Sequence, residues 1–259
     1  MKVFLSILFG LSLIACQEVT VNPDVAVAEK KVEEVAPRTG VWITVLGNVQ
    51  DGGSPHIGCE KECCKDLFLN PDNERKVTSL GVVDYRTNKS FVFDASPDFS
   101  TQLQHLTSKM LYGANPLSDG VFLTHAHIGH YSGLMYLGRE AISADSVPVY
   151  AMPRMENFLK NNGPWSQLVE LGNIDLITMQ EGDTLVLSEQ LKVIPFTVPH
   201  RDEFSETVGY KIEGKNKKAL FIPDIDKWHK WKKDIIEEVK KVDYAFLDAT
   251  FLNQNEVKR

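Results

Sequence analysis

The sequence predicts an α/β fold of the mixed, α+β kind, in which β-sheets are covered by helices. Strand-like runs fall into two groups with helical patterns between them, and several runs are apolar throughout, as expected for strands buried on both faces. No Pro- or Gly-rich linker divides residues 40–259, which indicates a single folded domain. The hydrophobic content of 43% and the charged content of 24% are typical of a globular protein.

The predicted elements follow from hydrophobic periodicity and from turn residues. Runs rich in β-branched and aromatic residues predict strands at 41–47, 79–85, 90–96, 120–127, 147–152, 174–179, 183–188, 191–198, 207–212, 218–225 and 242–250. Helical patterns cover 99–111, 132–141, 153–162 and 230–241. Pro153 stands at the first position of its helix, where its missing N–H costs nothing.

The N-terminus has the features of an export signal. A basic start, Met1-Lys2, precedes an apolar run too short to span a bilayer. The run ends in Leu13-Ile14-Ala15-Cys16, which resembles the bacterial lipobox and implies cleavage after residue 15 and lipid on Cys16. Ordinary cleavage nearby without lipid is the alternative. We therefore expect a signal peptide over 1–15, a lipidated cysteine and tether over 16–39, and a folded domain over 40–259 in the cell envelope, facing the periplasm or exterior.

The formal net charge of −7 argues against a nucleic-acid partner, because no basic excess is available to hold a phosphate backbone. We expect a small-molecule substrate instead, with the lipid on Cys16 as the link to a membrane. The sequence does not indicate an oligomeric state.

The stretch "LTHAHIGHYSGL" holds three of the seven histidines. His125 and His127 are two apart at the end of a predicted strand, so their imidazoles point the same way. His130 follows where the chain turns into a helix and can face the same pocket. Neutral imidazole is a favoured ligand for zinc and similar ions, and the spacing therefore predicts a metal site.

This motif resembles the H-x-H-x-D-H signature of the metallo-β-lactamase fold superfamily. The resemblance implies a four-layer αββα sandwich over about residues 40–250. It also implies that Asp94 supports the histidine loop, that His200 is the third main ligand, and that Asp224 lies at the metal. The stretches "VLGNVQDGGSPHIGCEKECC" and "DATF" are most similar to proteins related to pyrroloquinoline-quinone biosynthesis protein B.

Two departures from the family pattern bear on the metal count. Gly129 stands where the motif carries an aspartate that ligates a second metal. The pattern also ends with a further histidine, whereas His229 is the last histidine here and is expected at the surface. Either the protein is longer than this sequence or its second site is incomplete. We therefore expect one zinc per chain, bound by His125, His127 and His200; iron and manganese are not excluded. His130 and Asp224 alone are too few ligands to bind a second ion firmly.

The expected activity is that of a metal-dependent hydrolase acting on an ester, amide or phosphodiester. A metal-bound hydroxide would attack the substrate, because zinc lowers the pKa of its water from ~15.7 to about 7. Asp224 is the expected catalytic residue, orienting that water or accepting its proton; a loop carboxylate that caps the following helix is the alternative for it. The rival functions are an iron-dependent oxidative enzyme of the quinone-biosynthesis type and a lipid-anchored binding protein that has lost catalysis.

Three cysteines remain once Cys16 is set aside. Cys59 with Cys63 or Cys64 could form a disulfide in an oxidising compartment. The three cysteines with His56 could instead hold a small structural zinc, and Cys64 could simply be buried. The glycines of the Asp51-Gly52-Gly53 turn allow a close approach to a ligand, so this loop is expected to line the mouth of the site.

Overall fold

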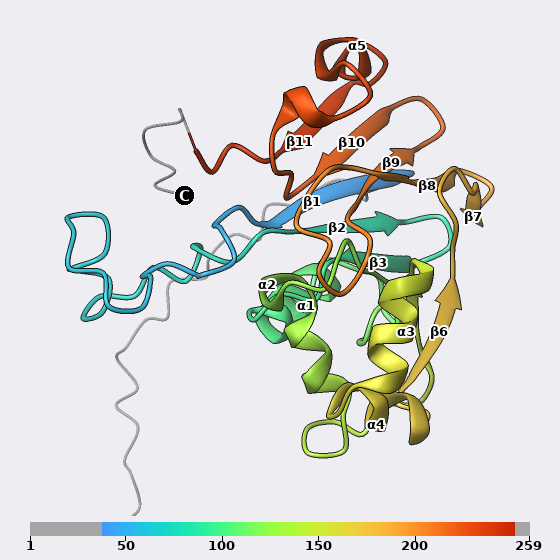
Figure 1. Ribbon diagram of the computed structural model, residues 1–259. Coiled ribbons are helices and arrows are strands. Elements are labelled where there is room, and N and C mark those ends of the chain that lie inside the picture. Colours follow the sequence, from blue (N-terminus) through green and yellow to red (C-terminus); the bar gives the residue numbers. More distant parts are fainter. Residues whose placement is uncertain (1–37, 252–259) are drawn as a thin grey trace, which may run out of the picture. The chain divides into compact units, whose positions relative to one another are not determined.

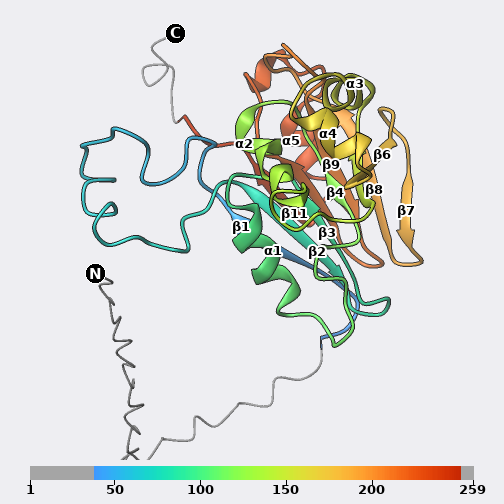
Figure 2. The ribbon, with the colours of Figure 1, turned by 90° about the horizontal axis from the view of Figure 1, so that it is seen from below.

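Two β-sheets form the centre of the structure, a computed structural model that describes residues 38–251 (Figures 1 and 2). The expected signal peptide, Cys16 and nearly all of the expected tether lie outside these residues. The first sheet has the order β1 to β6, with strands Val41–Gly47, Ser79–Asp84, Lys89–Phe93, Val121–Phe122, Val147–Ala151 and Ile174–Thr178. The second has the order β11-β10-β9-β8-β7, with β7 Leu185–Ser188, β8 Leu191–Thr197, β9 Val208–Glu213, β10 Lys218–Ile222 and β11 Tyr244–Leu247.

Helices cover the outer face of each sheet. The first sheet carries α1 (Phe99–Thr107), α3 (Pro153–Asn161) and α4 (Trp165–Glu170), and its outer core includes residues from all three. The second sheet carries α5 (Ile235–Val239) and the 3-10 helix η2 (Trp228–Lys230). The predicted four-layer αββα sandwich is confirmed.

Alternation along the strands assigns side chains to the three apolar layers. In β3, Phe91 and Phe93 face the layer between the sheets, whereas Val92 faces α1. In β10, Phe221 faces the same central layer while Leu220 and Ile222 face α5. Because successive side chains of a strand point to opposite faces, an uninterrupted apolar strand can serve two cores at once. This is why the buried strands lack a polar face in the sequence.

Each predicted strand has a counterpart, but the helices differ from prediction. In place of the helix expected over 132–141, the chain forms the 3-10 helix η1 (Ser132–Leu137). The short helix α2 (Ile128–Tyr131) precedes it. The helix expected over 230–241 shrinks to the five residues of α5. There the backbone at Trp231 is extended, since its indole turns inward to donate to the Thr197 carbonyl (3.0 Å), and Asp234 caps the new helix. The short α4 was not predicted.

Candidate metal centre

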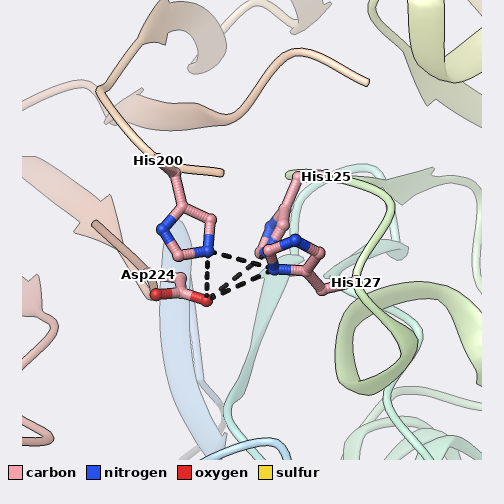
Figure 3. A group of neighbouring side chains, drawn as sticks. All are labelled: His125, His127, His200 and Asp224. Carbon is pink, nitrogen blue, oxygen red and sulfur yellow. Dashed lines mark hydrogen bonds and ion pairs between the residues drawn. The ribbon is translucent and has the colours of Figure 1, made fainter. Parts of the chain in front are cut away.

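The predicted ligands come together at one edge of the sandwich, where several strands end. His125 and His127 follow β4, His200 follows β8 and Asp224 follows β10 (Figure 3). One ligand atom from each lies within 4.8 Å of the others. His229, in contrast, is exposed and outside the cluster, as expected.

The cluster has the dimensions of a tetrahedral metal site. His127 Nδ1 lies 2.9 Å from His125 Nε2 and 3.0 Å from His200 Nε2. Asp224 Oδ2 lies 3.1, 3.4 and 4.0 Å from the nitrogens of His200, His125 and His127. Four donors at zinc-ligand distances around one ion would be separated by roughly 3.3 Å. Three ring nitrogens facing one another beside a carboxylate therefore fit a single divalent ion.

Asp94 fixes the orientation of the histidine loop. This fully buried aspartate follows β3 and accepts hydrogen bonds from the Thr124 backbone N–H (2.8 Å) and hydroxyl (2.9 Å). Its Oδ2 also lies 2.8 Å from His130 Nδ1. His130 Nε2 is thereby directed toward Asp224 Oδ2, at 3.8 Å. His130 thus lies beside the four-residue cluster and contacts it through Asp224.

Two further residues hold the site and were not predicted. Glu203 Oε2 lies 2.9 Å from His127 Nε2, the ring nitrogen that faces away from the cluster. The Ser205 hydroxyl accepts a hydrogen bond from the Ala126 N–H at 2.8 Å and so ties the histidine loop to the second sheet. Both lie in the stretch between His200 and β9, where several acidic and hydroxyl residues offer no spacing that singles out these two.

The protonation states of the cluster suit a cation. Burial lowers the pKa of His125 well below its usual value, which keeps the imidazole neutral and ready to bind a metal. Burial raises the pKa of Asp224, but hydrogen bonds from His125, His127 and His200 outweigh it, so the pKa ends far below the usual range. Hydrogen bonds that the His127 ring donates to Asp224 and Glu203, partly opposed by burial, raise the pKa of His127. The net effect is a neutral His125 ring, a more basic His127 ring and an ionised Asp224 carboxylate around one point.

A cavity of about 470 Å³ opens between the loops that follow β1 and β10, and none of the four cluster residues lines it. Its walls include Gln50 and Pro223, the residues before Asp51 and Asp224, and the polar side chains of Asp248 and Thr250. Another cavity, of about 490 Å³, lies at the other end of β1 and is lined by no histidine, cysteine, aspartate or glutamate. Of these two cavities, the first is lined by a carboxylate, that of Asp248, and by the residue that precedes Asp224.

The cysteine cluster forms without His56. The sulfur atoms of Cys59, Cys63 and Cys64 lie within 4.8 Å of one another, and all three are free thiols. Cys64 is buried and its sulfur lies 3.7 Å from that of Cys63. The His56 ring instead packs over Gly52 and points Nδ1 at the Ile57 carbonyl (3.0 Å). The structure therefore supports a three-thiol group and does not support His56 as its fourth ligand or a disulfide among these residues.

Residues 89–258 match the Beta-lactamase superfamily domain, which is more than half of the chain. The chain therefore belongs to this superfamily, as the histidine motif predicted.

The structure is similar to that of Zn²⁺-bound PqqB from Methylobacterium extorquens, with a TM-score of 0.65 and 21% identity over 80% of this chain and 72% of that one. It is also similar to a diphosphatase of the PhnP family, with a TM-score of 0.51 and 23% identity over 70% of this chain. The chain covers 64% of the diphosphatase, less than two thirds of its length. At these identities the similarities show the shared fold. No curated protein matches the chain.

Proposed function

We propose that the protein is a metal-dependent hydrolase whose ion is held by His125, His127, His200 and Asp224. The proposal rests on one observation, the convergence of three imidazole nitrogens and a carboxylate oxygen at tetrahedral spacing. A zinc ion held here would supply Lewis acidity and, with a fifth ligand position open to solvent, a water that ionises near neutral pH. The bound zinc of the structurally similar PqqB supports zinc as the first ion to test.

The roles of the side chains follow from their surroundings. Glu203 orients His127 from behind, an arrangement that commonly sets the tautomer and basicity of a metal-binding histidine. Asp224 is better suited to hold and orient than to accept a proton, because a carboxylate with a strongly lowered pKa is a weak base at neutral pH. Substrate would reach the cluster from the cavity lined by Gln50 and Pro223, the residues that precede Asp51 and Asp224.

The substrate class we favour carries a negative charge near the bond that breaks. Arg201 lies at the exposed rim, with its guanidinium 3.4 Å from His127 Nδ1, and a guanidinium can bind a phosphate or carboxylate through two hydrogen bonds. The similar fold of a diphosphatase makes a phosphodiester a sensible first substrate. Simple esters and amides are the other classes.

The test compares His125→Asn with His229→Asn in zinc-loaded protein. Hydrolysis of bis(p-nitrophenyl) phosphate and p-nitrophenyl acetate should fall at least a hundredfold in His125→Asn and stay at the wild-type rate in His229→Asn, whose histidine is exposed and outside the cluster. Equal rates in both variants would contradict the proposal. Oxygen uptake by iron-loaded protein with no hydrolysis would favour the oxidative rival. Metal binding without turnover of either kind would favour the binding protein.

A further inference from the structure

Gly129, the residue that departs from the family motif, has no room for a side chain. A Cβ built on Gly129 would lie 2.0 Å from Asp51 Cβ, 2.8 Å from Asp51 Cα and 3.3 Å from Asp51 Cγ. Real Cβ atoms do not approach other carbons this closely. The side chain of Asp51, 78 residues earlier and at the end of β1, thus occupies the volume where the motif aspartate would begin.

The turn that carries Asp51 is held in place on both sides. The backbone N–H groups of Asn48 and Val49 donate to the Lys76 carbonyl at 3.1 and 3.0 Å. The Gln50 side chain accepts a hydrogen bond from the Gly52 N–H at 2.9 Å, and Gly53 adopts a φ of +80° that suits glycine. The position of Asp51 is therefore set by its own loop and does not depend on a bond from its carboxylate.

The Asp51 carboxylate makes no hydrogen bond or ion pair with another residue of the described chain, although the residue is half-buried. Its neighbour is His130, whose Nδ1 is held by Asp94 while its Nε2 faces Asp224. Asp51 packs directly against Gly129, the residue that precedes His130, so its side chain lies beside the loop that carries this ring. The Asp51 side chain thus lies against the loop of His130, whose Nε2 is 3.8 Å from Asp224 Oδ2.

We propose that Asp51 replaces the carboxylate missing at position 129 and, with His130 and Asp224, binds a second divalent cation next to the first. The inference rests on the proposed function, since Asp224 would serve both ions. It changes the expected metal count from one to two. Paired ions are a recurrent solution for hydrolysing phosphoesters, because together they stabilise the attacking and the leaving oxygen.

The experiment measures the number of metal ions bound per chain and does not depend on enzymatic activity. Full-length protein freed of metal with a chelator is dialysed against Mn²⁺, which prefers oxygen and imidazole ligands and avoids the thiols of the cysteine cluster, and bound metal is measured by mass spectrometry. Asp51→Asn keeps the shape and removes the charge. Asp66→Asn makes the same change at an exposed position of the same loop. We expect two ions per chain in the wild type and in Asp66→Asn, and one in Asp51→Asn.

A double variant that moves the aspartate from position 51 to position 129 tests whether the two positions compete for the same space. Gly129→Asp alone should lose stability, because its Cβ meets Asp51, whereas Gly129→Asp with Asp51→Gly removes the closest clash and should bind two ions again. Two ions retained in Asp51→Asn would overturn the inference. One ion in both the wild type and Asp51→Asn would also overturn it and leave the proposed function intact. No ion in the wild type with Mn²⁺, and none when the dialysis is repeated with Zn²⁺, would refute the proposed function itself.

Discussion

At the scale of single residues, Glu203 is the link between the exposed rim and the metal centre. Its carboxylate holds the outer nitrogen of His127 and leaves Nδ1 to face the cluster. Because partners of this kind change metal affinity by about 10- to 100-fold and this one is partly exposed, Glu203→Gln should weaken zinc binding by about tenfold. Competition with a chromogenic zinc chelator measures the change. Glu60→Gln, at an exposed position, is the control, and equal affinities for both variants would contradict the assigned role.

The residues of the site differ in how far the sequence reveals them. His125 and His127 were identified by spacing, because residues two apart on a strand share a face. His200, Asp224 and Asp94 depended on the resemblance to a family, and the structure brings all three to the cluster. Glu203 carried no signal, and the loop of Asp51 was expected to line the mouth of the site through its glycines, without a ligand role for Asp51. Their roles come from tertiary contacts between loops, 76 residues apart in one case and 78 in the other.

At the scale of elements, the close packing of η1 against α1 holds the histidine loop. A Cβ on Gly133 would lie 2.2 Å from the Ser96 carbonyl oxygen and 2.4 Å from Phe99 Cβ. Since backbone cannot move aside cheaply, Gly133→Ala should lower the free energy of unfolding by about 1–3 kcal/mol. Urea denaturation measures this. Gly163→Ala, which has nothing within 4 Å of the new Cβ, should be nearly neutral, and similar losses in both would contradict this packing argument.

Tyr210 in β9 should make the folded protein less stable at alkaline pH. Burial and the charge of Asp94 raise its pKa well above 10, and its hydroxyl donates to the Leu123 carbonyl at the end of β4. Above about pH 10 the unfolded chain loses this proton while the folded state keeps it. The folded state then binds more protons, so the free energy of unfolding falls by up to about 1.4 kcal/mol per pH unit from this group.

Tyr210→Phe separates this effect from the other tyrosines. At pH 8 the variant should be less stable by about 1 kcal/mol, because a hydrogen bond is lost. The gap should narrow as the pH rises past 10, since the variant has no proton to lose at this position. Urea unfolding at pH 8 to 11 gives both curves. Parallel curves would show that Tyr210 does not titrate differently in the folded state.

The strands could be predicted from the sequence more reliably than the helices. Apolar β-branched runs mark buried strands whatever their neighbours are, so β1 to β11 all have predicted counterparts. The helices are short, and their ends are set by tertiary contacts such as the inward turn of Trp231. α4 has six residues, too few for a period of 3.6 to be recognised.

At the scale of the whole molecule, we propose that lipid on Cys16 anchors the chain to the cell envelope. In residues 38–251 no helix is long and apolar enough to cross a membrane. If the lipobox resemblance holds, radiolabelled palmitate should be incorporated into the wild type in a bacterial host and lost in Cys16→Ser, which should also move from the membrane fraction to the soluble one. Label retained in Cys16→Ser would show that the lipobox resemblance is misleading.

The central claim is that His125, His127, His200 and Asp224 hold a metal ion. Diffraction from zinc-loaded crystals, collected on both sides of the zinc absorption edge, tests it most directly. The account predicts an anomalous peak that lies within about 2.0–2.2 Å of one atom from each of these four residues. A well-ordered cluster with no peak between its rings, or zinc bound only at Cys59, Cys63 and Cys64, would contradict it.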